Sequence, residues 1–198
     1  MLRAALTGGI ATGKSFCLSR FAAVGAAVID ADDLAHQAVD RESDGLKEVV
    51  RRFGRGVLLP DGALDRKGLG RIVFSDASAR ADLEAIVHPR VYRQIDQWFA
   101  DLPSGTRVAL ADIPLLFETG HEHDFERVVV CACEPEEQFR RLTSRDRLTA
   151  EEARARLAAQ WPIGEKVKRA DYVIETDGTF AETDAQVRGV YEALLAER

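Results

Sequence analysis

The first fifteen residues constrain the fold of this chain more than any other segment. A short apolar run, Ala4–Thr7, leads into Gly8-Gly9-Ile10-Ala11-Thr12-Gly13-Lys14-Ser15, which has the pattern Gly-x-x-x-x-Gly-Lys-Ser. Apolar residues then recur at helical spacing until Gly25 ends the run. A strand, a glycine-rich turn and a helix in this order form the context that a phosphate-binding P-loop requires.

Each residue type in this loop has a chemical reason. Gly8 and Gly13 allow backbone angles that a side chain forbids, so successive N–H groups can turn inward around an anion. The helix that begins at Lys14 adds the positive end of its dipole. Lys14 can reach the β- and γ-phosphates, and the Ser15 hydroxyl can ligate Mg²⁺. We therefore predict an ATP-binding site formed by Gly8, Gly9, Ile10, Ala11, Thr12, Gly13, Lys14, Ser15 and Phe16.

Composition narrows the class of protein. The net charge of −6 argues against a general nucleic-acid binder or a binder of anionic membranes. No apolar run approaches the length of a membrane span. Three cysteines, Cys17, Cys131 and Cys133, are too few for a disulfide framework, and we expect buried thiols. These features indicate a cytoplasmic protein and leave its oligomeric state open.

Strand and helix signals alternate along the chain. After the first strand and helix, strands are predicted at residues 26–29, 107–112, 128–133 and 171–174. Alternation of this kind is typical of a parallel sheet covered on both faces. We predict an α/β, three-layer P-loop NTPase fold with a five-stranded parallel sheet. A terminal helix is expected to begin with a capping box, Thr179 to Glu182.

Two insertions interrupt the predicted sheet. Residues 34–101 are mainly helical, with separate amphipathic helices expected around 46–53, 83–87 and 91–99. Residues 138–169 are rich in arginine, which suits a lid that closes over phosphates, although such charges can also be ordinary solvated helix charges. We predict a nucleotide-binding core (1–33, 102–137 and 170–198), a helical acceptor-binding domain (34–101) and a lid (138–169).

A P-loop alone does not separate a switch GTPase, a motor ATPase and a small-molecule kinase. The chain contains no asparagine, so the guanine-reading Asn-Lys-x-Asp motif cannot be present. Phosphoryl transfer to an acceptor held between the core and two flaps is therefore favoured. The alternatives are a kinase for another acceptor, such as a nucleoside monophosphate, and a nucleotide-dependent switch without acceptor chemistry.

Acidic residues follow two predicted strands, at the edge of the sheet where α/β proteins bind ligands. Asp30, Asp32 and Asp33 follow the second strand, and Asp30 and Asp32 share a side if that strand continues. Asp32 is the candidate general base, whereas Asp30 or Asp33 can instead cap the next helix. Asp112, at the end of the third strand, either holds Mg²⁺, directly or through water, or stabilises a loop.

The order and spacing of further segments resemble the dephospho-CoA kinases, which phosphorylate the ribose 3′-hydroxyl of dephospho-coenzyme A. The resemblance runs from Leu6 almost to the C-terminus. The segments that carry it are Leu6-Thr7-Gly8-Gly9-Ile10, Val28-Ile29-Asp30-Ala31-Asp32 followed by His36, Ile86-Val87-His88-Pro89, Ile113-Pro114-Leu115-Leu116-Phe117-Glu118, Gln138-Phe139-Arg140-Arg141-Leu142 with Arg145, Ala159-Gln160, and Arg169-Ala170-Asp171-Tyr172-Val173-Ile174.

The resemblance implies a core, a helical acceptor-binding domain and a lid that act on ATP, Mg²⁺ and dephospho-coenzyme A. Asp32 would accept the proton of the 3′-hydroxyl, and Lys14, Arg141 and Arg145 would neutralise the transferred phosphoryl group. The residues that would contact the acceptor are Asp32, His36, His88, Pro89, Phe117 and Glu118.

The chain departs from the family pattern at two places. Phe16 follows the P-loop serine where a threonine is usual, and Thr176-Asp177-Gly178 lacks the asparagine that typically precedes the glycine. The second departure leaves the contacts to adenine open. His121 and His123 look like a metal pair, but no third ligand is evident, and a loop without metal is the simpler interpretation.

Overall fold

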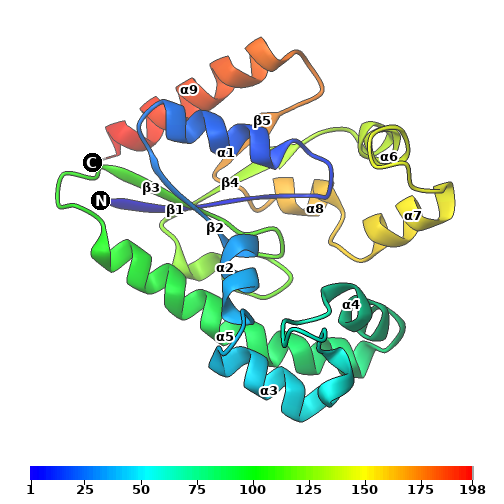
Figure 1. Ribbon diagram of the computed structural model, residues 1–198. Helices are drawn as coiled ribbons and strands as arrows, with labels where there is room; N and C mark the ends of the chain where they lie inside the picture. Colours follow the sequence, from blue (N-terminus) through cyan, green and yellow to red (C-terminus); the bar gives the residue numbers. More distant parts are fainter. Residues whose placement is uncertain (198) are drawn as a thin grey trace. The chain divides into compact units, whose positions relative to one another are not determined.

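The computed structural model describes residues 1–197, which form two units. Unit 1 comprises Met1–Ile29 and the chain from Leu102 onward, and it contains the sheet. Unit 2 comprises Asp30–Asp101 and is helical (Figure 1). In the described part of the chain, no helix is both long and apolar enough to cross a membrane.

Unit 1 is built on five strands in the order β2-β3-β1-β4-β5 (Figure 1). The strands are β1 (Leu2–Gly8), β2 (Ala27–Asp30), β3 (Val108–Asp112), β4 (Arg127–Ala132) and β5 (Tyr172–Glu175). The central strand β1 pairs in parallel with β3 and β4, so that Leu6 lies opposite Asp112 on one side and Val129 on the other. The predicted five-stranded parallel α/β fold is confirmed, and the predicted strand ends differ from the observed ends by no more than two residues.

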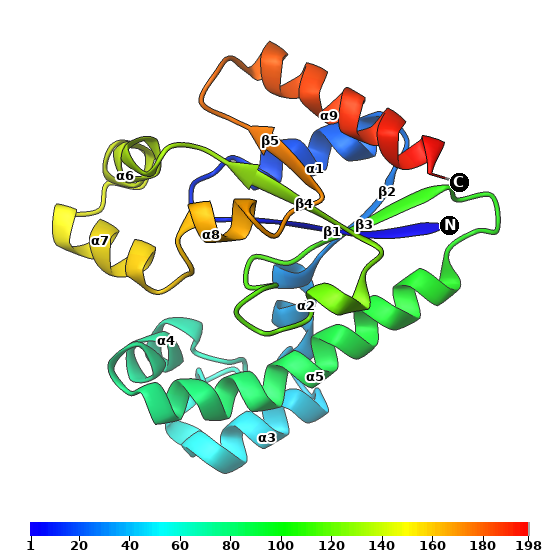
Figure 2. The ribbon, with the colours of Figure 1, turned by 180° about the vertical axis from the view of Figure 1, so that it is seen from behind.

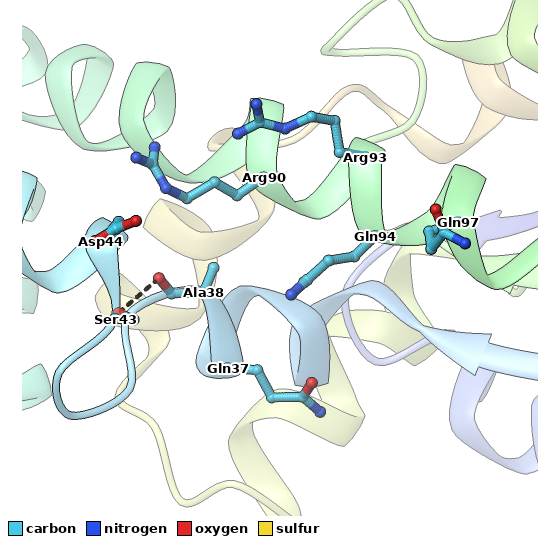
Figure 3. Close-up of a pocket in the computed structure, with 9 residues that line it drawn as sticks. Gln37, Ala38, Ser43, Asp44, Arg90, Arg93, Gln94 and Gln97 are labelled. Carbon is cyan, nitrogen blue, oxygen red and sulfur yellow. Dashed lines mark hydrogen bonds between the residues drawn. The ribbon is translucent and has the colours of Figure 1, made fainter.

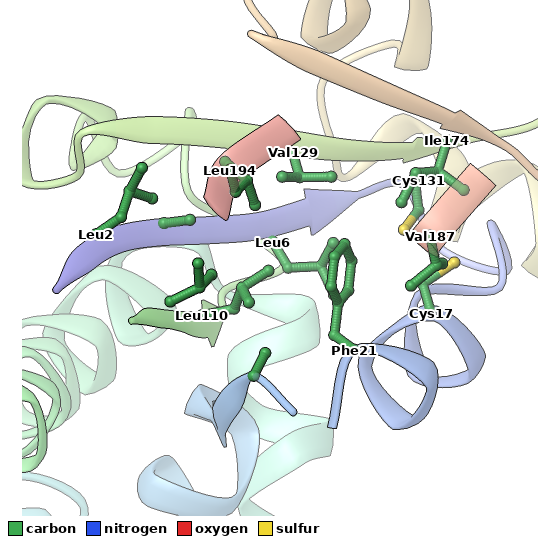
Figure 4. Packing of buried hydrophobic residues seen from close by; sticks show 13 residues of the cluster. Leu2, Leu6, Cys17, Phe21, Leu110, Val129, Cys131, Ile174, Val187 and Leu194 are labelled. Atoms are coloured by element: carbon green, nitrogen blue, oxygen red, sulfur yellow. The ribbon is translucent and has the colours of Figure 1, made fainter. Parts of the chain in front are cut away.

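Two helices cover one face of this sheet. They are α1 (Lys14–Ala23) and α9 (Phe180–Ala196), which lie side by side in Figure 1 and Figure 2. Their apolar sides enclose a core in which Leu6 of β1, Phe21 of α1 and Val187 of α9 are fully buried (Figure 4). Asp184 of α9 accepts hydrogen bonds from Arg20 of α1 and from Arg188, which ties the two helices together at the edge of this core.

The three cysteines are free and buried, as the sequence predicts. Cys17 of α1 and Cys131 of β4 belong to the core of unit 1 (Figure 4). Burial raises the pKa of the Cys133 thiol to about 11. Because the thiolate is the reactive form, the raised pKa disfavours reaction of this cysteine near neutral pH.

The arginine-rich segment of unit 1 forms three short helices: α6 (Pro135–Ser144), α7 (Ala150–Ala158) and α8 (Ile163–Val167). Helix α6 packs against α7, and α8 packs against β4 (Figure 2). A capping box at Thr149 begins α7. The predicted capping box at Thr179 begins α9, where the Thr179 side chain accepts from the Glu182 amide and the Glu182 carboxylate accepts from the Thr179 amide. A further 3₁₀ turn, η2 (Glu122–Asp124), precedes β4.

Unit 2 is a group of helices packed around one long helix. Its elements are α2 (Ala31–Ala38), α3 (Asp44–Phe53), the 3₁₀ turn η1 (Arg55–Val57), α4 (Arg66–Ser75) and α5 (Ala77–Asp101). Helices α2, α3 and α4 each pack against α5. Their separate core includes Val49, Val57 and Leu69.

The expectation of two helices at 83–87 and 91–99 is wrong, because α5 continues through Pro89. A proline inside a helix removes one backbone hydrogen bond and displaces the preceding turn, but packing on both sides can hold the helix together. Val91 and Ile95 are buried on the far side of the proline, and Ala79 is buried before it. The Arg90 guanidinium also donates to the carbonyl of Ile86, in the turn that the proline disrupts.

Candidate active site

The P-loop lies where β1 ends and α1 begins. Gly13 has φ 78°, as expected of a residue that must take a left-handed conformation, and Ala11 reaches the same region with φ 61°. The expectation that Gly8 also adopts backbone angles forbidden to other residues is wrong, because its φ is not positive. A Cβ at Gly8 would instead lie 2.5 Å from the carbonyl oxygen of Cys131 in β4. Gly8 is therefore needed for the close approach of two strands.

The loop is fixed by polar side chains from distant parts of unit 1. The Thr12 hydroxyl donates to the carbonyl of Gly9 at 2.8 Å. The Gln160 side chain accepts from the Ile10 amide at 2.7 Å, and the Gln138 side chain donates to the Ile10 carbonyl at 2.7 Å. Both glutamines come from the arginine-rich segment, and sequence reasoning gave neither a role in the site.

Lys14 and Asp112 form a partly buried ion pair. The Lys14 ammonium lies 2.6 Å and 2.7 Å from the two carboxylate oxygens of Asp112, whose side chain is fully buried at the end of β3. The pair holds the P-loop lysine against the central sheet. The first turn of α1 also places the Ser15 side chain on the exposed surface.

The residues near this pair have the chemistry of a magnesium site. Mg²⁺ takes oxygen ligands, and in phosphoryl-transfer sites it combines one or two protein groups with substrate phosphates. The Ser15 hydroxyl and the Asp112 carboxylate are oxygen donors of this kind, so the residues present fit the ion. In the described residues, no group of three or more His, Cys, Asp or Glu side chains could hold a metal by itself.

Arg141 connects the P-loop to the segment after β5. Its guanidinium donates to the carbonyl of Ala11 at 3.1 Å and to the hydroxyl of Thr176 at 3.2 Å. Glu137, one helical turn earlier, accepts from Arg141 at 2.7 Å. Hydrogen bonds from Arg140 first, and from Arg141 next, lower the pKa of the Glu137 carboxyl to about 2. Arg145 is exposed and pairs with Asp146 at 2.8 Å.

Phe117 and Glu118 are held by residues around α8. Phe117 is buried and stacks on Trp161, with ring centroids 6.3 Å apart. The Glu118 carboxylate accepts from the Trp161 amide at 2.8 Å and pairs with the Lys166 ammonium at 2.9 Å. These contacts give both residues a structural task in unit 1, and their predicted contact with the acceptor stays a prediction.

Lys166 is a residue whose position sequence reasoning did not anticipate. In the sequence, Lys166 is one of several basic residues in the segment 138–169, where an exposed side chain is expected. In the structure its side chain is fully buried. The ammonium donates to the carbonyl of Gly8 at 3.2 Å and to that of Pro114 at 2.9 Å. Burial lowers the pKa of this ammonium, and the hydrogen bond to Glu118 opposes part of that shift. Lys166 thus links α8 to the start of the P-loop.

In unit 2, the acidic cluster begins α2. Asp30 is the helix cap, because its side chain accepts from the Asp32 amide at 2.8 Å. The strand ends at Asp30, so Asp32 lies in the first turn of the helix and not on a continued strand. Its side chain is exposed. A carboxylate in the first helical turn is stabilised in its ionised form by the helix dipole.

The other predicted acceptor residues of unit 2 lie on α2 and α5. His36 is exposed near the end of α2, and its carbonyl accepts from Arg66 at 3.0 Å. His88 is half-buried and Pro89 exposed at the middle of α5. A pocket of about 310 Å³ in unit 2 is lined by residues that include Gln37 and Arg90, the sequence neighbours of His36 and Pro89. Its lining residues are Gln37, Ala38, Ser43, Asp44, Gly45, Arg90, Arg93, Gln94 and Gln97, of which α5 supplies the guanidinium groups (Figure 3).

His121 contacts an acidic residue of its own loop. The Nδ1 atom of His121 lies 2.6 Å from the carboxylate of Asp124, within the turn η2. His123 is largely exposed beside Glu122. Both histidines therefore lie beside acidic residues of their own loop.

The central parallel sheet, the P-loop whose lysine pairs with Asp112, and the basic helical segment define a P-loop kinase. A family model described as dephospho-CoA kinase matches residues 2–182. The chain belongs to the dephospho-CoA kinase family.

Individual relatives agree with this assignment over nearly the whole chain. The dephospho-CoA kinase of Geobacillus kaustophilus is 44% identical over 186 residues, which cover 93% of this chain and 92% of that protein. A dephospho-CoA kinase structure from Campylobacter jejuni has a TM-score of 0.74 at 30% identity and covers 98% of both chains. A Thermus thermophilus protein has a TM-score of 0.82 at 35% identity, covering 99% of this chain and 97% of that one. A shikimate kinase from Acinetobacter baumannii, at 17% identity and a TM-score of 0.57, shares the fold.

Proposed function

We propose that the protein transfers the γ-phosphoryl group of ATP to the ribose 3′-hydroxyl of dephospho-coenzyme A. The reaction is an ATP-dependent phosphorylation that yields coenzyme A and ADP. The observation that carries the proposal is the P-loop with its Lys14–Asp112 pair in a chain of the dephospho-CoA kinase family. The three free thiols favour a reducing compartment, and we assign the protein to the cytoplasm.

Unit 1 supplies the ATP site. The backbone of Gly8–Phe16 would surround the phosphates. The ammonium of Lys14 would contact the β- and γ-phosphates in addition to the carboxylate of Asp112. The carboxylate of Asp112 keeps the ammonium of Lys14 in place, so the site would need little reorganisation when ATP binds. Arg141, which donates to the carbonyl of Ala11 in the P-loop, would neutralise charge on the transferred phosphoryl group. Arg145, which is exposed and pairs with Asp146 of its own segment, would add to this effect.

Mg²⁺, when bound, would neutralise phosphate charge and orient the γ-phosphoryl group. Ser15 would hold it through its hydroxyl, and Asp112 would do so directly or through water. The carboxylate of Asp112 would thereby serve two cations, the ammonium of Lys14 and the metal ion.

Unit 2 supplies the acceptor site and the base. Asp32 would accept the proton of the 3′-hydroxyl as the oxygen attacks phosphorus. Its place in the first turn of α2, behind the cap made by Asp30, leaves the carboxylate exposed to a substrate. His36, His88 and Pro89 would contact dephospho-coenzyme A. Phe117 and Glu118 are also proposed as acceptor contacts.

The segment 138–169 would act as a lid. Its residues Gln138 and Gln160 both bond to the backbone of Ile10, so the segment already touches the phosphate loop at two points. Closure over ATP would exclude water, which competes with the acceptor for the γ-phosphoryl group. We divide the chain accordingly into a core (1–33, 102–137, 170–198), an acceptor domain (34–101) and this lid.

The test compares two neighbouring acidic residues of α2. Asp32→Asn is expected to lower the rate of coenzyme A formation at least 100-fold, because general base catalysis contributes about 10²–10⁴. Its Kd for ATP should stay within about twofold of the wild type. Asp33→Asn is the matched control, since it is equally exposed in the same turn, and it should keep most of the activity. Near-normal turnover of Asp32→Asn would contradict the assignment of the base, and a wild-type protein that forms no coenzyme A would contradict the function itself.

A further inference from the structure

Among the described residues, Lys166 of α8 is the only basic side chain that is fully buried. A lysine ammonium has three N–H donors. Three oxygen atoms surround this one: the carbonyl of Gly8 at 3.2 Å, the carbonyl of Pro114 at 2.9 Å and the carboxylate of Glu118 at 2.9 Å. Each donor of the ammonium therefore has an acceptor.

The three acceptors belong to parts of unit 1 that have separate tasks in the proposed function. Gly8 begins the P-loop, which would hold the phosphates of ATP. Pro114 and Glu118 lie in the segment after β3, where Glu118 is a proposed acceptor contact. Lys166 itself belongs to the proposed lid, 138–169. One side chain thus joins the phosphate loop, an acceptor contact and the lid.

The orientation of Glu118 depends on Lys166. One oxygen of the Glu118 carboxylate accepts from the Trp161 amide at 2.8 Å and pairs with the ammonium of Lys166. The other oxygen, Oε2, is buried and has no hydrogen-bond partner among the described residues. Without Lys166, the carboxylate would keep one backbone donor and no compensating charge.

Stability alone does not explain a lysine at this position. Burial of a charge costs solvation, and a well-packed apolar side chain often gives equal or greater stability than a buried ion pair. Burial lowers the pKa of the Lys166 ammonium, which is a consequence of that cost. Three directed hydrogen bonds, however, fix three oxygen atoms relative to one another, which an apolar side chain cannot do. Group transfer needs such placement, because small displacements of the reacting groups lower the rate strongly.

We propose that Lys166 is a positioning residue for phosphoryl transfer, which fixes the P-loop and Glu118 relative to each other; this inference rests on the proposed function. Lys166 acts through the carbonyl of Gly8 and the carboxylate of Glu118. Its effect is on the rate of transfer more than on the binding of ATP, because Gln138 and Gln160 also hold the phosphate loop.

The experiment compares the full-length wild type with Lys166→Met, which keeps the length of the side chain and removes its charge and its donors. Isothermal titration calorimetry with Mg-ATP gives the Kd and the fraction of competent ATP sites. The rate of coenzyme A formation at saturating substrates is then divided by that fraction. The kcat per competent site should fall about 10- to 100-fold, whereas the Kd for Mg-ATP should stay within about threefold of the wild type.

Two further variants serve as controls. Lys168→Met is the matched control, because Lys168 lies two residues further on, is exposed and pairs with Glu165 at 2.7 Å. Its kcat and its Kd for Mg-ATP should equal those of the wild type. Lys166→Arg keeps the positive charge and has N–H donors for the same acceptors, so its kcat should be at least about fivefold above that of Lys166→Met.

A kcat per competent site of Lys166→Met within about twofold of the wild type would overturn the inference, because activity would then be lost only with folded protein. A Lys166→Met protein with no competent ATP site would overturn it for the same reason. An arginine variant as slow as Lys166→Met would also overturn it. These results leave the proposed function standing, whereas a wild-type protein that forms no coenzyme A would contradict that function.

Discussion

At the scale of single residues, the ion pair of Lys14 with the buried carboxylate of Asp112 links stability to the proposed catalysis. Removing one partner leaves a buried charge without compensation, which costs about 3–5 kcal/mol. Lys14→Met should therefore lower the free energy of unfolding by about that amount and reduce turnover at least 100-fold. Urea denaturation and ADP release measure the two effects.

A double variant separates the effect on stability from the effect on turnover. Lys14→Met/Asp112→Leu removes both charges, so it should recover much of the lost stability while turnover stays low. Wild-type stability of Lys14→Met alone would contradict the role of the pair in holding the P-loop.

The ion pairs of Glu137 make the stability of the protein depend on pH in the acidic range. The pKa of its carboxyl is about 2 in the folded protein, against an ordinary value of 4.5. Between these values the unfolded chain binds the proton more readily than the folded chain does. The contribution to stability is therefore complete above about pH 4.5 and is lost as the pH falls toward 2.

The substitution Glu137→Gln removes this contribution. Its free energy of unfolding should fall less steeply than that of the wild type between about pH 4.5 and 2, as measured by urea denaturation at a series of pH values. Parallel curves for the two proteins would show that the Arg140 and Arg141 bonds do not persist in solution.

Residues of the site could be predicted where the chain itself fixes their place. Lys14, Ser15 and Asp30 follow from a local pattern, a P-loop or a helix cap, that extends over a few neighbours. Gln138, Gln160 and Lys166 could not be given a role, because each bonds to the P-loop from more than 120 positions away. No local pattern distinguishes a glutamine that binds a distant backbone from one on the surface.

At the scale of elements, α5 shows how packing outweighs local preference. Pro89 predicts a break, yet the helix runs from Ala77 to Asp101 because its residues are buried on both sides of the proline. Local preference is a weak guide here, since the apolar spacing before and after the proline stays nearly in phase. The start of α9 could be predicted from the local sequence, because it is set by the capping box at Thr179.

Pro89→Ala tests both the helix and the proposed acceptor site. Alanine restores the missing backbone hydrogen bond, so the free energy of unfolding should rise by about 1–3 kcal/mol. If Pro89 contacts the acceptor as proposed, the KM for dephospho-coenzyme A should rise several-fold while the KM for ATP is unchanged. A loss of stability would contradict the description of the helix, and an unchanged KM would remove Pro89 from the acceptor site.

At the scale of the whole molecule, alternating strands and helices were sufficient to predict the parallel sheet. Each strand of unit 1 is a short apolar run bounded by loops, and such runs have few alternatives in a chain that begins with a P-loop. The acceptor, in contrast, is not encoded in the fold, since shikimate kinase shares it at 17% identity. It follows from the ordered motifs that place this chain in its family.

The most direct test of the central claim is ADP release with Mg-ATP across a panel of acceptors: dephospho-coenzyme A, adenosine, AMP, CMP and none. We predict strong stimulation by dephospho-coenzyme A alone, with coenzyme A as the second product. Stimulation by AMP or CMP would leave the P-loop kinase in place and contradict the acceptor. Equal, slow hydrolysis with every member of the panel would contradict phosphoryl transfer itself.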